Sequence, residues 1–284
     1  MSDWGKGVNN NIGWGQGADN NIGWGSIYDK SNAGETLLKS DLNIDAFIIE
    51  VKTDNAGTSN DNQFQFTGAE GDYDVVAKQN GTQVATFNDL SGEETITFAN
   101  GAGTYILEIT PKETNGFNKI GFDLGNDRRK MLDIKQWGNI VWTDFDNAFR
   151  DCENMVATAT DLPDLSICED LSGMFSGTLA NPNCSKWNVS NITNFAVMFL
   201  DALNANPDLR LWDVSNGTSF YSILFNSNLS TENLTAIYEN WSQLQLQQNV
   251  PFNAGTTKYN ASGQAGRDIL INTYNWTIAD GGLA

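Results

Sequence analysis

The sequence predicts a mainly β protein with short helices (α+β), and three features support this. Short runs rich in β-branched and aromatic residues fill 45–123, a pattern recurs four times between 137 and 225, and two stretches with helical spacing follow 229. The chain has 284 residues, which is long enough for more than one domain. We expect four parts: an extended N-terminal arm at 1–38, a β-sandwich at 39–126, a repeat solenoid at 127–229 and a helical and strand C-terminal cap at 230–284.

The arm contains a repeat of its own, with a period of ten residues. The run Trp4-Gly-Lys-Gly-Val-Asn-Asn-Asn-Ile-Gly is followed by Trp14-Gly-Gln-Gly-Ala-Asp-Asn-Asn-Ile-Gly and then by Trp24-Gly-Ser-Ile-Tyr28. Such a segment has too little apolar area to fold alone. It is either a flexible Gly/Asn linker or, as we expect, an arm that orders against a partner surface. The expected docking residues are Trp4, Ile12, Trp14, Ile22, Trp24 and Tyr28.

Seven runs in the second part are expected to be strands. Each is short and rich in Val, Ile, Thr, Phe or Tyr, and Asn80-Gly81 between two of them predicts a two-residue hairpin turn. Short strands at this spacing predict a β-sandwich. The runs are 45–53, 63–66, 73–79, 82–87, 94–98, 104–109 and 119–122.

The repeat region is marked by Phe at 149, 175, 199 and 225, at spacings of 26, 24 and 26 residues. A period of this size predicts a solenoid, in which each unit buries its apolar side against the next unit. Each unit begins with an alternating stretch that suits a short strand, and continues with an apolar i, i+4 pair that predicts a short, capped helix. The pairs are Phe145/Phe149, Leu171/Phe175, Phe195/Phe199 and Tyr221/Phe225, with caps at Thr143, Glu169, Thr193 and Ser219.

Different elements are expected at the two ends of the repeat region. Before it, the basic run 128–130 is expected to contact acidic residues of the repeats. After it, residues 229–241 have helical spacing, with Ser230 or Thr231 as the N-cap. The remaining expected elements are a strand at 250–252, a helix at 266–274 and a strand at 276–278.

The composition excludes several classes of function. The net charge of −19 would repel a phosphate backbone, so we expect no nucleic-acid binding. The chain has no His, which excludes His-dependent triads and His-ligated zinc sites. We expect no membrane span, because no apolar run approaches about 18 residues, and no secretory signal, because Met1-Ser-Asp-Trp-Gly lacks a basic and an apolar region. The Cys residues, expected to be buried core thiols, are Cys152, Cys168 and Cys184.

We expect no catalytic, cofactor or metal site. A glycosidase needs two carboxyl groups about 5–10 Å apart, and Asp144 and Asp170 occupy equivalent places in successive units. We expect Asp144 and Asp170 to cap the short helices of their units, and not to act as catalytic groups. A calcium site at Asp72 and Asp74 is an alternative, although the Asp-x-Asp-x-Asp-Gly loop is missing. The three carboxylate pairs are Asp144/Asp146, Glu169/Asp170 and Asp72/Asp74.

Three segments resemble two known families. Trp187-Asn-Val-Ser-Asn-Ile-Thr-Asn-Phe-Ala-Val-Met-Phe199 and Trp212-Asp-Val-Ser-Asn216 look like the W-D-V-S-N-V-T-N-M-x-x-M-F unit of BspA-like leucine-rich-repeat surface proteins. This resemblance implies a leucine-rich-repeat-like α/β solenoid over 127–229, used for adhesion and display. Gly103-Thr-Tyr-Ile-Leu-Glu-Ile109 is similar to a strand of immunoglobulin-like and PKD-like domains, which implies an Ig-like β-sandwich.

The arm resembles the W-G-x-G-x-x-N-N-x-G-W-G-S-I-Y openings of tailed-bacteriophage structural proteins. The first hypothesis is therefore a non-enzymatic display protein of a phage virion, assembled in the host cytoplasm. Its expected partners are other virion proteins, further copies of itself, and a host surface glycan or protein. The second hypothesis is a bacterial leucine-rich-repeat surface adhesin. The third is a polysaccharide-degrading spike that uses Asp144 and Asp170.

Overall fold

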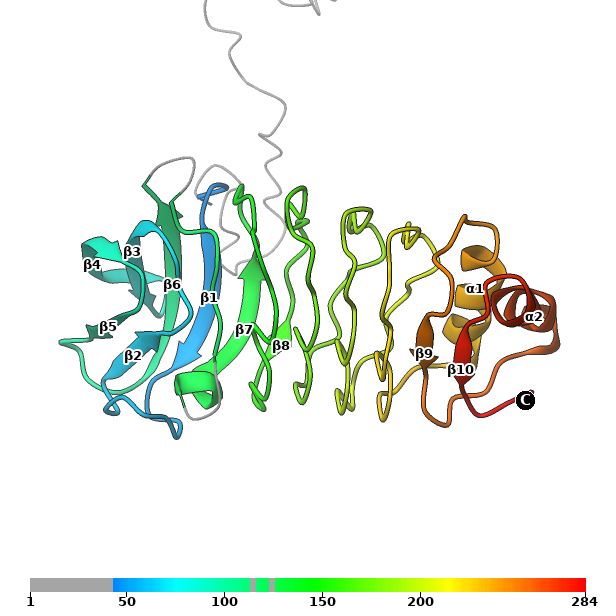
Figure 1. The fold of residues 1–284 in the computed structure, drawn as a ribbon. Helices are drawn as coiled ribbons and strands as arrows, with labels where there is room; N and C mark the ends of the chain where they lie inside the picture. Colours follow the sequence, from blue (N-terminus) through cyan, green and yellow to red (C-terminus); the bar gives the residue numbers. More distant parts are fainter. Residues whose placement is uncertain (1–42, 113–115, 123–125) are drawn as a thin grey trace, which may run out of the picture. The chain divides into compact units, whose positions relative to one another are not determined.

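The computed structural model describes residues 43–112, 116–122 and 126–284, and residues 44–284 form one compact unit. The described part is mainly β with two α-helices, as predicted (Figure 1). The strands are β1 (Phe47–Lys52), β2 (Gln63–Phe66), β3 (Asp72–Gln79), β4 (Thr82–Ser91), β5 (Glu94–Thr97), β6 (Thr104–Pro111), β7 (Met131–Gln136), β8 (Val156–Ala157), β9 (Pro251–Asn253) and β10 (Thr277–Ala279). The helices are α1 (Thr231–Trp241) and α2 (Gln264–Asn272), with the 3-10 helices η2 (Asp127–Lys130) and η3 (Ala261–Gly263).

Strands from both sides of residue 126 form one six-stranded sheet, in the order β4-β3-β6-β1-β7-β8. The first five strands are antiparallel, whereas β7 and β8 are parallel, so the sheet is mixed. A second sheet, β2-β5, shares its core, because Phe66 of β2 lies 5.4 Å from Tyr73 of β3 between ring centroids. Six of the seven predicted strands are present. In place of the seventh, an isolated bridge joins Lys119 to Glu70.

The turn between β3 and β4 is the predicted hairpin. Asn80 and Gly81 have φ of 51° and 76°, the left-handed conformation that both central residues of a type I′ turn require. The register of β4 against β3 shifts twice, once between Tyr73 and Val75 and once beside Ala77. Irregularities of this kind at the edge of a sheet hinder pairing with a further strand.

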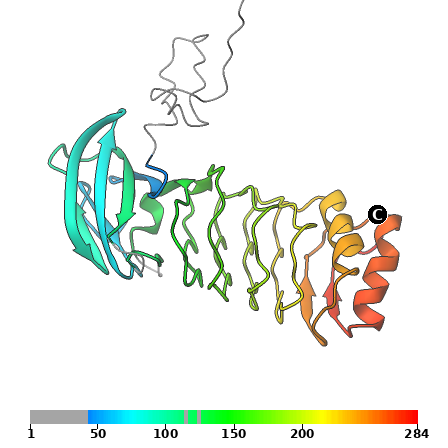
Figure 2. The same ribbon diagram turned by 90° about the horizontal axis from the view of Figure 1, so that it is seen from above.

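Each repeat unit contains consecutive β-turns where the sequence predicts a short helix, so that prediction is wrong. In the first unit, Ala148 N donates to Phe145 O and Cys152 N to Phe149 O, each at 3.1 Å. The other three units repeat this arrangement, and Figure 2 shows the successive units side by side. We call these segments the turn ribbon, which comprises residues 145–152, 171–178, 195–202 and 220–227.

Positive φ angles explain why the turn ribbon is not helical. The third residue of each of these turns is left-handed, and this interrupts a right-handed helix every four residues. Turns with a left-handed third residue are of the type II kind, which favours Gly or Asn there. The positions are Asn147, Asp151, Gly173, Gly177, Val197, Asp201, Ser222 and Asn226.

The backbone N–H groups of the turn ribbon alternate between two kinds of acceptor. In the first three units, every second N–H donates within its own unit, to a backbone carbonyl or to the side chain that opens the segment, and the N–H between them donates to a carbonyl of the following unit. Each of these three units therefore satisfies its donors only when the following unit is in place. The bonds between units include Asn147 N to Ser172 O (2.8 Å), Gly173 N to Ala196 O (2.9 Å) and Val197 N to Tyr221 O (2.8 Å).

Large side chains stack in register behind the turn ribbon. Phe175 lies between Phe149 and Phe199, at ring-centroid distances of 6.0 and 5.7 Å with nearly parallel planes. The indole of Trp212 donates to Cys184 O of the preceding unit at 2.8 Å. The three thiols are free and buried in this core, as predicted.

The fourth unit differs from its predicted register by one residue. Phe220 and Leu224 fill the buried places that the sequence analysis assigns to Tyr221 and Phe225, and the latter two are 59% and 45% exposed. The spacing of Phe residues is misleading here because Phe225 is not the counterpart of Phe199. Counted from the Trp of each unit, the offset is 25 residues and pairs Phe199 with Leu224.

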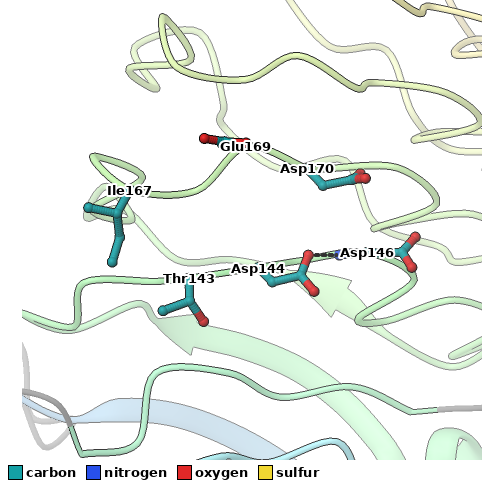
Figure 3. Close-up of a pocket in the computed structure, with 6 residues that line it drawn as sticks. All are labelled: Thr143, Asp144, Asp146, Ile167, Glu169 and Asp170. Carbon is teal, nitrogen blue, oxygen red and sulfur yellow. Dashed lines mark hydrogen bonds between the residues drawn. The ribbon is translucent and has the colours of Figure 1, made fainter.

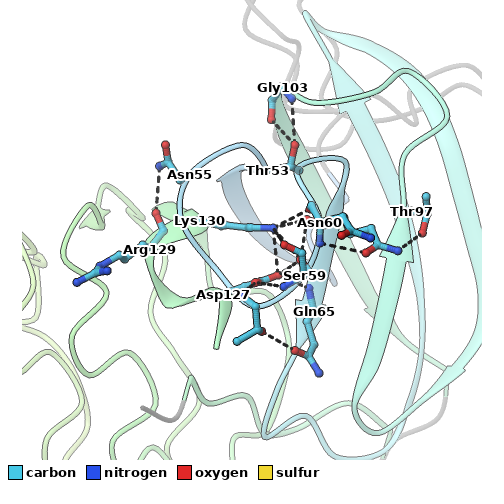
Figure 4. Close-up of polar contacts among 12 residues, drawn as sticks. Thr53, Asn55, Ser59, Asn60, Gln65, Thr97, Gly103, Asp127, Arg129 and Lys130 are labelled. Atoms are coloured by element: carbon cyan, nitrogen blue, oxygen red, sulfur yellow. Dashed lines mark hydrogen bonds and ion pairs between the residues drawn. The ribbon is translucent and has the colours of Figure 1, made fainter. Parts of the chain in front are cut away.

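A buried ion pair joins η2 to the loop between β1 and β2 (Figure 4). The charged atoms of Asp127 and Lys130 are 3.6 Å apart, and neither side chain is exposed. Burial lowers the pKa of Lys130, and the nearby Asp127 opposes this shift. A buried pair is tolerated when its remaining hydrogen bonds are satisfied. Lys130 Nζ donates to Ser59 O, Ser59 Oγ, Asn60 O and Gln63 O at 2.7–3.0 Å, and Asp127 accepts from the N–H groups of Thr58, Ser59 and Gln65 at 2.8–3.1 Å.

The two arginines of η2 contact acidic residues of the first repeat unit, as predicted. Arg129 Nε lies 3.0 Å from Glu153 Oε2, and Arg128 lies 3.6 Å from Asp151. The basic run therefore connects the first repeat unit, through Arg128 and Arg129, to the loop between β1 and β2, through Lys130.

The C-terminal cap continues the stack with helices and parallel strands. Ser230 is the N-cap of α1, since its side chain accepts from Asn233 N at 3.2 Å. β9 pairs in parallel with β10, and Phe252 of β9 forms a bridge to Phe220 of the fourth unit. Both helices and both strands that the sequence predicts in this part are confirmed, with bounds within a few residues.

Asp280 joins the end of the chain to both cap helices. Its Oδ2 accepts from Tyr238 Oη of α1 (2.6 Å) and from Arg267 Nε of α2 (2.7 Å). Burial by itself would raise the pKa of Asp280, but the bonds from Arg267 and Tyr238 outweigh burial, and the pKa is lowered.

Val197→Gly is expected to stabilise the fold. Val197 is a half-buried, β-branched residue at φ 53°, a conformation that costs an L-residue about 1–2 kcal/mol. Glycine adds some entropy to the unfolded chain. The free energy of unfolding, measured by urea denaturation, should still rise by about 0.5–1 kcal/mol.

The matched control is Gly173→Val, at the same turn position of the second unit. The free energy of unfolding should fall by about 2 kcal/mol or more, because a valine at φ 63° would be strained and its Cβ, 2.3 Å from Asn147 Oδ1, would also displace the Asn147 side chain. A loss of stability in Val197→Gly would show that the left-handed valine is not strained.

Asp280→Asn is expected to weaken the fold in a pH-dependent way. The folded-state pKa of Asp280 lies below the ordinary value of about 3.9. Its contribution is therefore complete above about pH 4 and is lost as the pH falls through the lowered value. At pH 7 the variant should lose about 2–3 kcal/mol of unfolding free energy, and the difference from wild type should shrink below about pH 4. Urea denaturation of both proteins from pH 7 to below about pH 4 measures the difference in unfolding free energy. A difference that does not change with pH would contradict the lowered pKa of Asp280.

Candidate functional site

An acidic depression of about 360 Å³ lies over the first two repeat units (Figure 3). Two of the three predicted carboxylate pairs meet here, one from the start of the first ribbon segment and one from the start of the second. The lining residues are Thr143, Asp144, Asp146, Ile167, Glu169 and Asp170.

Hydrogen bonds of the fold already use the three aspartate carboxylates of this depression. Asp144 Oδ1 accepts from Asp146 N at 2.8 Å, and Asp144 Oδ2 lies 3.1 Å from Lys119 Nζ, whose pKa this contact raises. Asp170 Oδ1 accepts from Ser172 N at 2.6 Å, and its Oδ2 accepts from Asn194 Nδ2 at 2.9 Å. Asp144 and Asp170 are equivalent, as predicted, but each closes the turn that opens a ribbon segment and does not cap a helix.

The predicted capping residues lie one position too early in three of the four units. The hydroxyls of Thr143 and Thr193 donate to carbonyls of the preceding layer, Asn118 O and Glu169 O, each at 3.3 Å. The side chains that accept from the N–H two residues ahead are Asp144, Asp170, Asn194 and Ser219. Ser219 is the one predicted cap that accepts such a bond. In the fourth unit the predicted register is itself shifted by one residue, and the two shifts cancel.

Asp74 of the third carboxylate pair has a structural role, and the Cys168 and Cys184 thiols are buried. Asp74 Oδ1 accepts from Asp89 N at 2.8 Å and lies 3.6 Å from Lys112 Nζ. Burial raises the pKa of the Cys168 and Cys184 thiols to about 12, so neither is a thiolate at neutral pH. Within residues 43–112, 116–122 and 126–284, no three His, Cys, Asp or Glu side chains are grouped to hold a metal ion.

The predicted docking residues Trp4, Ile12, Trp14, Ile22, Trp24 and Tyr28 lie outside the described residues. In the part that the structure does describe, no helix is long and apolar enough to cross a membrane.

The described surface has an aromatic feature that the sequence analysis misses. Tyr221 and Phe225 are exposed because the fourth unit buries Phe220 and Leu224 in their place. Counting the third and fourth units from Trp187 and Trp212 would have placed both rings outside the core. The two aromatic rings are exposed to solvent, whereas Asp144 and Asp170 of the acidic depression close turns.

The family described as "Mycoplasma protein of unknown function, DUF285" matches residues 143–263. The matched segment contains the whole turn ribbon, α1 and β9. No curated protein and no solved structure matches the chain.

Asp144→Asn and Asp144→Ala are expected to differ in stability. Asparagine keeps an oxygen that accepts from Asp146 N and loses a partly exposed ion pair, which is worth less than about 1 kcal/mol. Alanine also removes the acceptor and should cost about 1 kcal/mol more in unfolding free energy. Glu169→Gln, at an exposed position of the same depression, is the control and should change the unfolding free energy by less than about 0.5 kcal/mol. Equal losses for the two Asp144 variants in urea denaturation would contradict the turn-closing role.

Proposed function

We propose that the protein is a non-enzymatic structural and display protein of a tailed-phage virion. In this proposal residues 39–126 are an Ig-like β-sandwich, 127–229 are a BspA-like leucine-rich-repeat solenoid, and 230–284 are its cap. The observation that carries the proposal is the use of the polar groups in the repeats. Asp144, Asp170 and Asn194 close turns within their own units, and backbone bonds join each of the first three units to the next. Asp144 and Asp170 therefore already have structural partners, and the stacked units present an outer surface.

The N-terminal arm supplies the attachment in this proposal. Its three indoles recur every ten residues among Gly and Asn, a pattern that presents large apolar anchors without a core of its own. Docked into another virion protein, the arm would hold the described unit at the particle surface. We further propose that the protein is a homo-oligomer, as symmetric virion parts commonly are, and that the repeat surface contacts a host glycan or protein.

A bacterial leucine-rich-repeat surface adhesin is the second candidate. The family match favours it, because that family is described for a cellular organism, Mycoplasma. The neighbouring genes separate the candidates. Capsid and tail genes favour the virion protein, whereas secretion genes without them favour the adhesin.

Deletion of residues 1–28 is expected to abolish incorporation into phage particles and to leave the described unit folded. The reason is that the anchors Trp4, Trp14 and Trp24 lie in the deleted segment, whereas the core begins at Ala46. Particles purified by density gradient and probed with an antibody to the repeat region measure incorporation, and circular dichroism measures folding.

A matched pair of point variants sharpens this test. Replacing Trp4, Trp14 and Trp24 with Ala should reduce incorporation as strongly as the deletion, whereas replacing Lys6 and Gln16 with Ala should not. Full incorporation of the deleted chain would show that the arm does not dock the protein.

A further inference from the structure

Tyr221 and Phe225 form an exposed aromatic pair on the fourth unit of the turn ribbon. Their side chains are 59% and 45% exposed. Each is the second residue of its β-turn, in turns 220–223 and 224–227, so the two rings occupy equivalent positions on the ribbon. The core does not require them, because the apolar places of this unit are filled by other residues.

The apolar character of this pair extends to the neighbouring unit and then disappears. The same two positions of the third unit hold Ala196 and Leu200, both half-buried, and the two units are joined there by backbone bonds. In the second unit the same positions hold Ser172 and Ser176, which are buried, and in the first unit they hold Asp146 and Arg150. Of these four pairs of equivalent positions, only the pair on the fourth unit is aromatic and exposed.

The exposed area is too small for a stable protein partner. A fully covered aromatic side chain buries about 150–250 Å², so two rings at 59% and 45% exposure offer on the order of 200 Å². A stable protein interface needs roughly 800 Å² on each partner. The exposed area of the pair is enough to contact one or two rings of a small ligand.

Hydrogen-bonding groups are carried by residues next to Phe225 in the sequence and in the preceding unit. Asn226, the exposed residue after Phe225, donates from Nδ2 to Asp201 Oδ1 at 2.7 Å. An amide has two donor hydrogens and an acceptor oxygen, and a carboxylate has two acceptor oxygens. This bond uses one donor and one acceptor, so both groups keep capacity for a polar ligand.

We propose that the aromatic pair binds a neutral, β-linked hexopyranose glycan. The C–H groups on the flat face of such a sugar are weakly positive and are attracted to the negative face of an aromatic ring. Hydroxyls at the sugar's edge bond to Asn226 and Asp201. Sulfated or carboxylated glycans are disfavoured by the net charge of −19. The inference rests on the proposed display function and names its ligand class.

Isothermal titration calorimetry of the full chain with cellohexaose, laminarihexaose and N-acetylchitohexaose tests this proposal. At least one should bind with a Kd of about 0.1–1 mM. Tyr221→Ala combined with Phe225→Ala should weaken binding at least tenfold without changing the melting temperature, and Tyr221→Phe should retain it. The matched control is Leu203→Ala with Leu211→Ala, which removes side chains that are 61% and 67% exposed elsewhere on the repeats and should leave the Kd unchanged.

Three results would overturn the proposal. The first is no binding of any of the three glycans at millimolar concentration, or equal affinity in the double alanine variant. The second is tighter binding of a heparin hexasaccharide than of the neutral glycans. The third is a sedimentation coefficient that rises with protein concentration in wild type but not in the double alanine variant, which would make the pair a self-association contact. All are measured on purified protein, so they are independent of incorporation into particles.

Discussion

The repeat region depends on the alternation of backbone donors along the turn ribbon. One row of N–H groups bonds within the unit and the other row bonds to the next unit, as Asn147 does to Ser172. A single unit would leave the second row without protein acceptors, and a buried N–H without an acceptor costs about 1–3 kcal/mol. The same alternation requires a left-handed residue in every turn. It also explains the polar side chain at the start of each ribbon segment, because that side chain accepts the N–H two residues ahead.

The two ends of the stack are closed in different ways, and buried ionic groups mark both. At the first end, β7 and β8 continue the sheet of β1 and β6, and the Asp127–Lys130 pair ties η2 to the β1–β2 loop. At the other end, β9 continues the stack from the fourth unit, and Asp280 ties the last residues to α1 and α2. Each buried charge has an opposite charge and several hydrogen bonds, which is the condition under which burial is tolerated.

The sequence predicts the strands before residue 112 and after residue 250 well, but β7 and β8 are not predicted, and the short strand expected at the start of each repeat unit is reduced to isolated bridges. The hairpin at Asn80, six strands, the Ser230 cap and the cap helices follow from local propensity, which these segments obey. The turn ribbon does not follow from propensity, because an i, i+4 apolar pair fits a helix and a pair of β-turns equally. Val197 at positive φ is unpredictable for the same reason, since only bonds to the neighbouring units hold a valine there. The exposed Tyr221 and Phe225 were predictable from the Trp spacing but not from the Phe spacing, and the role of Asp144 required the turn geometry.

A stack held by shared donors suits the display role that we propose, because its outer positions are free to vary while the backbone bonds persist. We infer that these donors make the repeat units one cooperative body. Amide hydrogen exchange of the full chain, followed by NMR, measures this cooperativity for each donor. The donors between units, Asn147, Gly173 and Val197, should exchange with one common opening free energy that equals the global free energy of unfolding. Opening free energies that differ from unit to unit, with each unit exchanging independently of its neighbours, would contradict it.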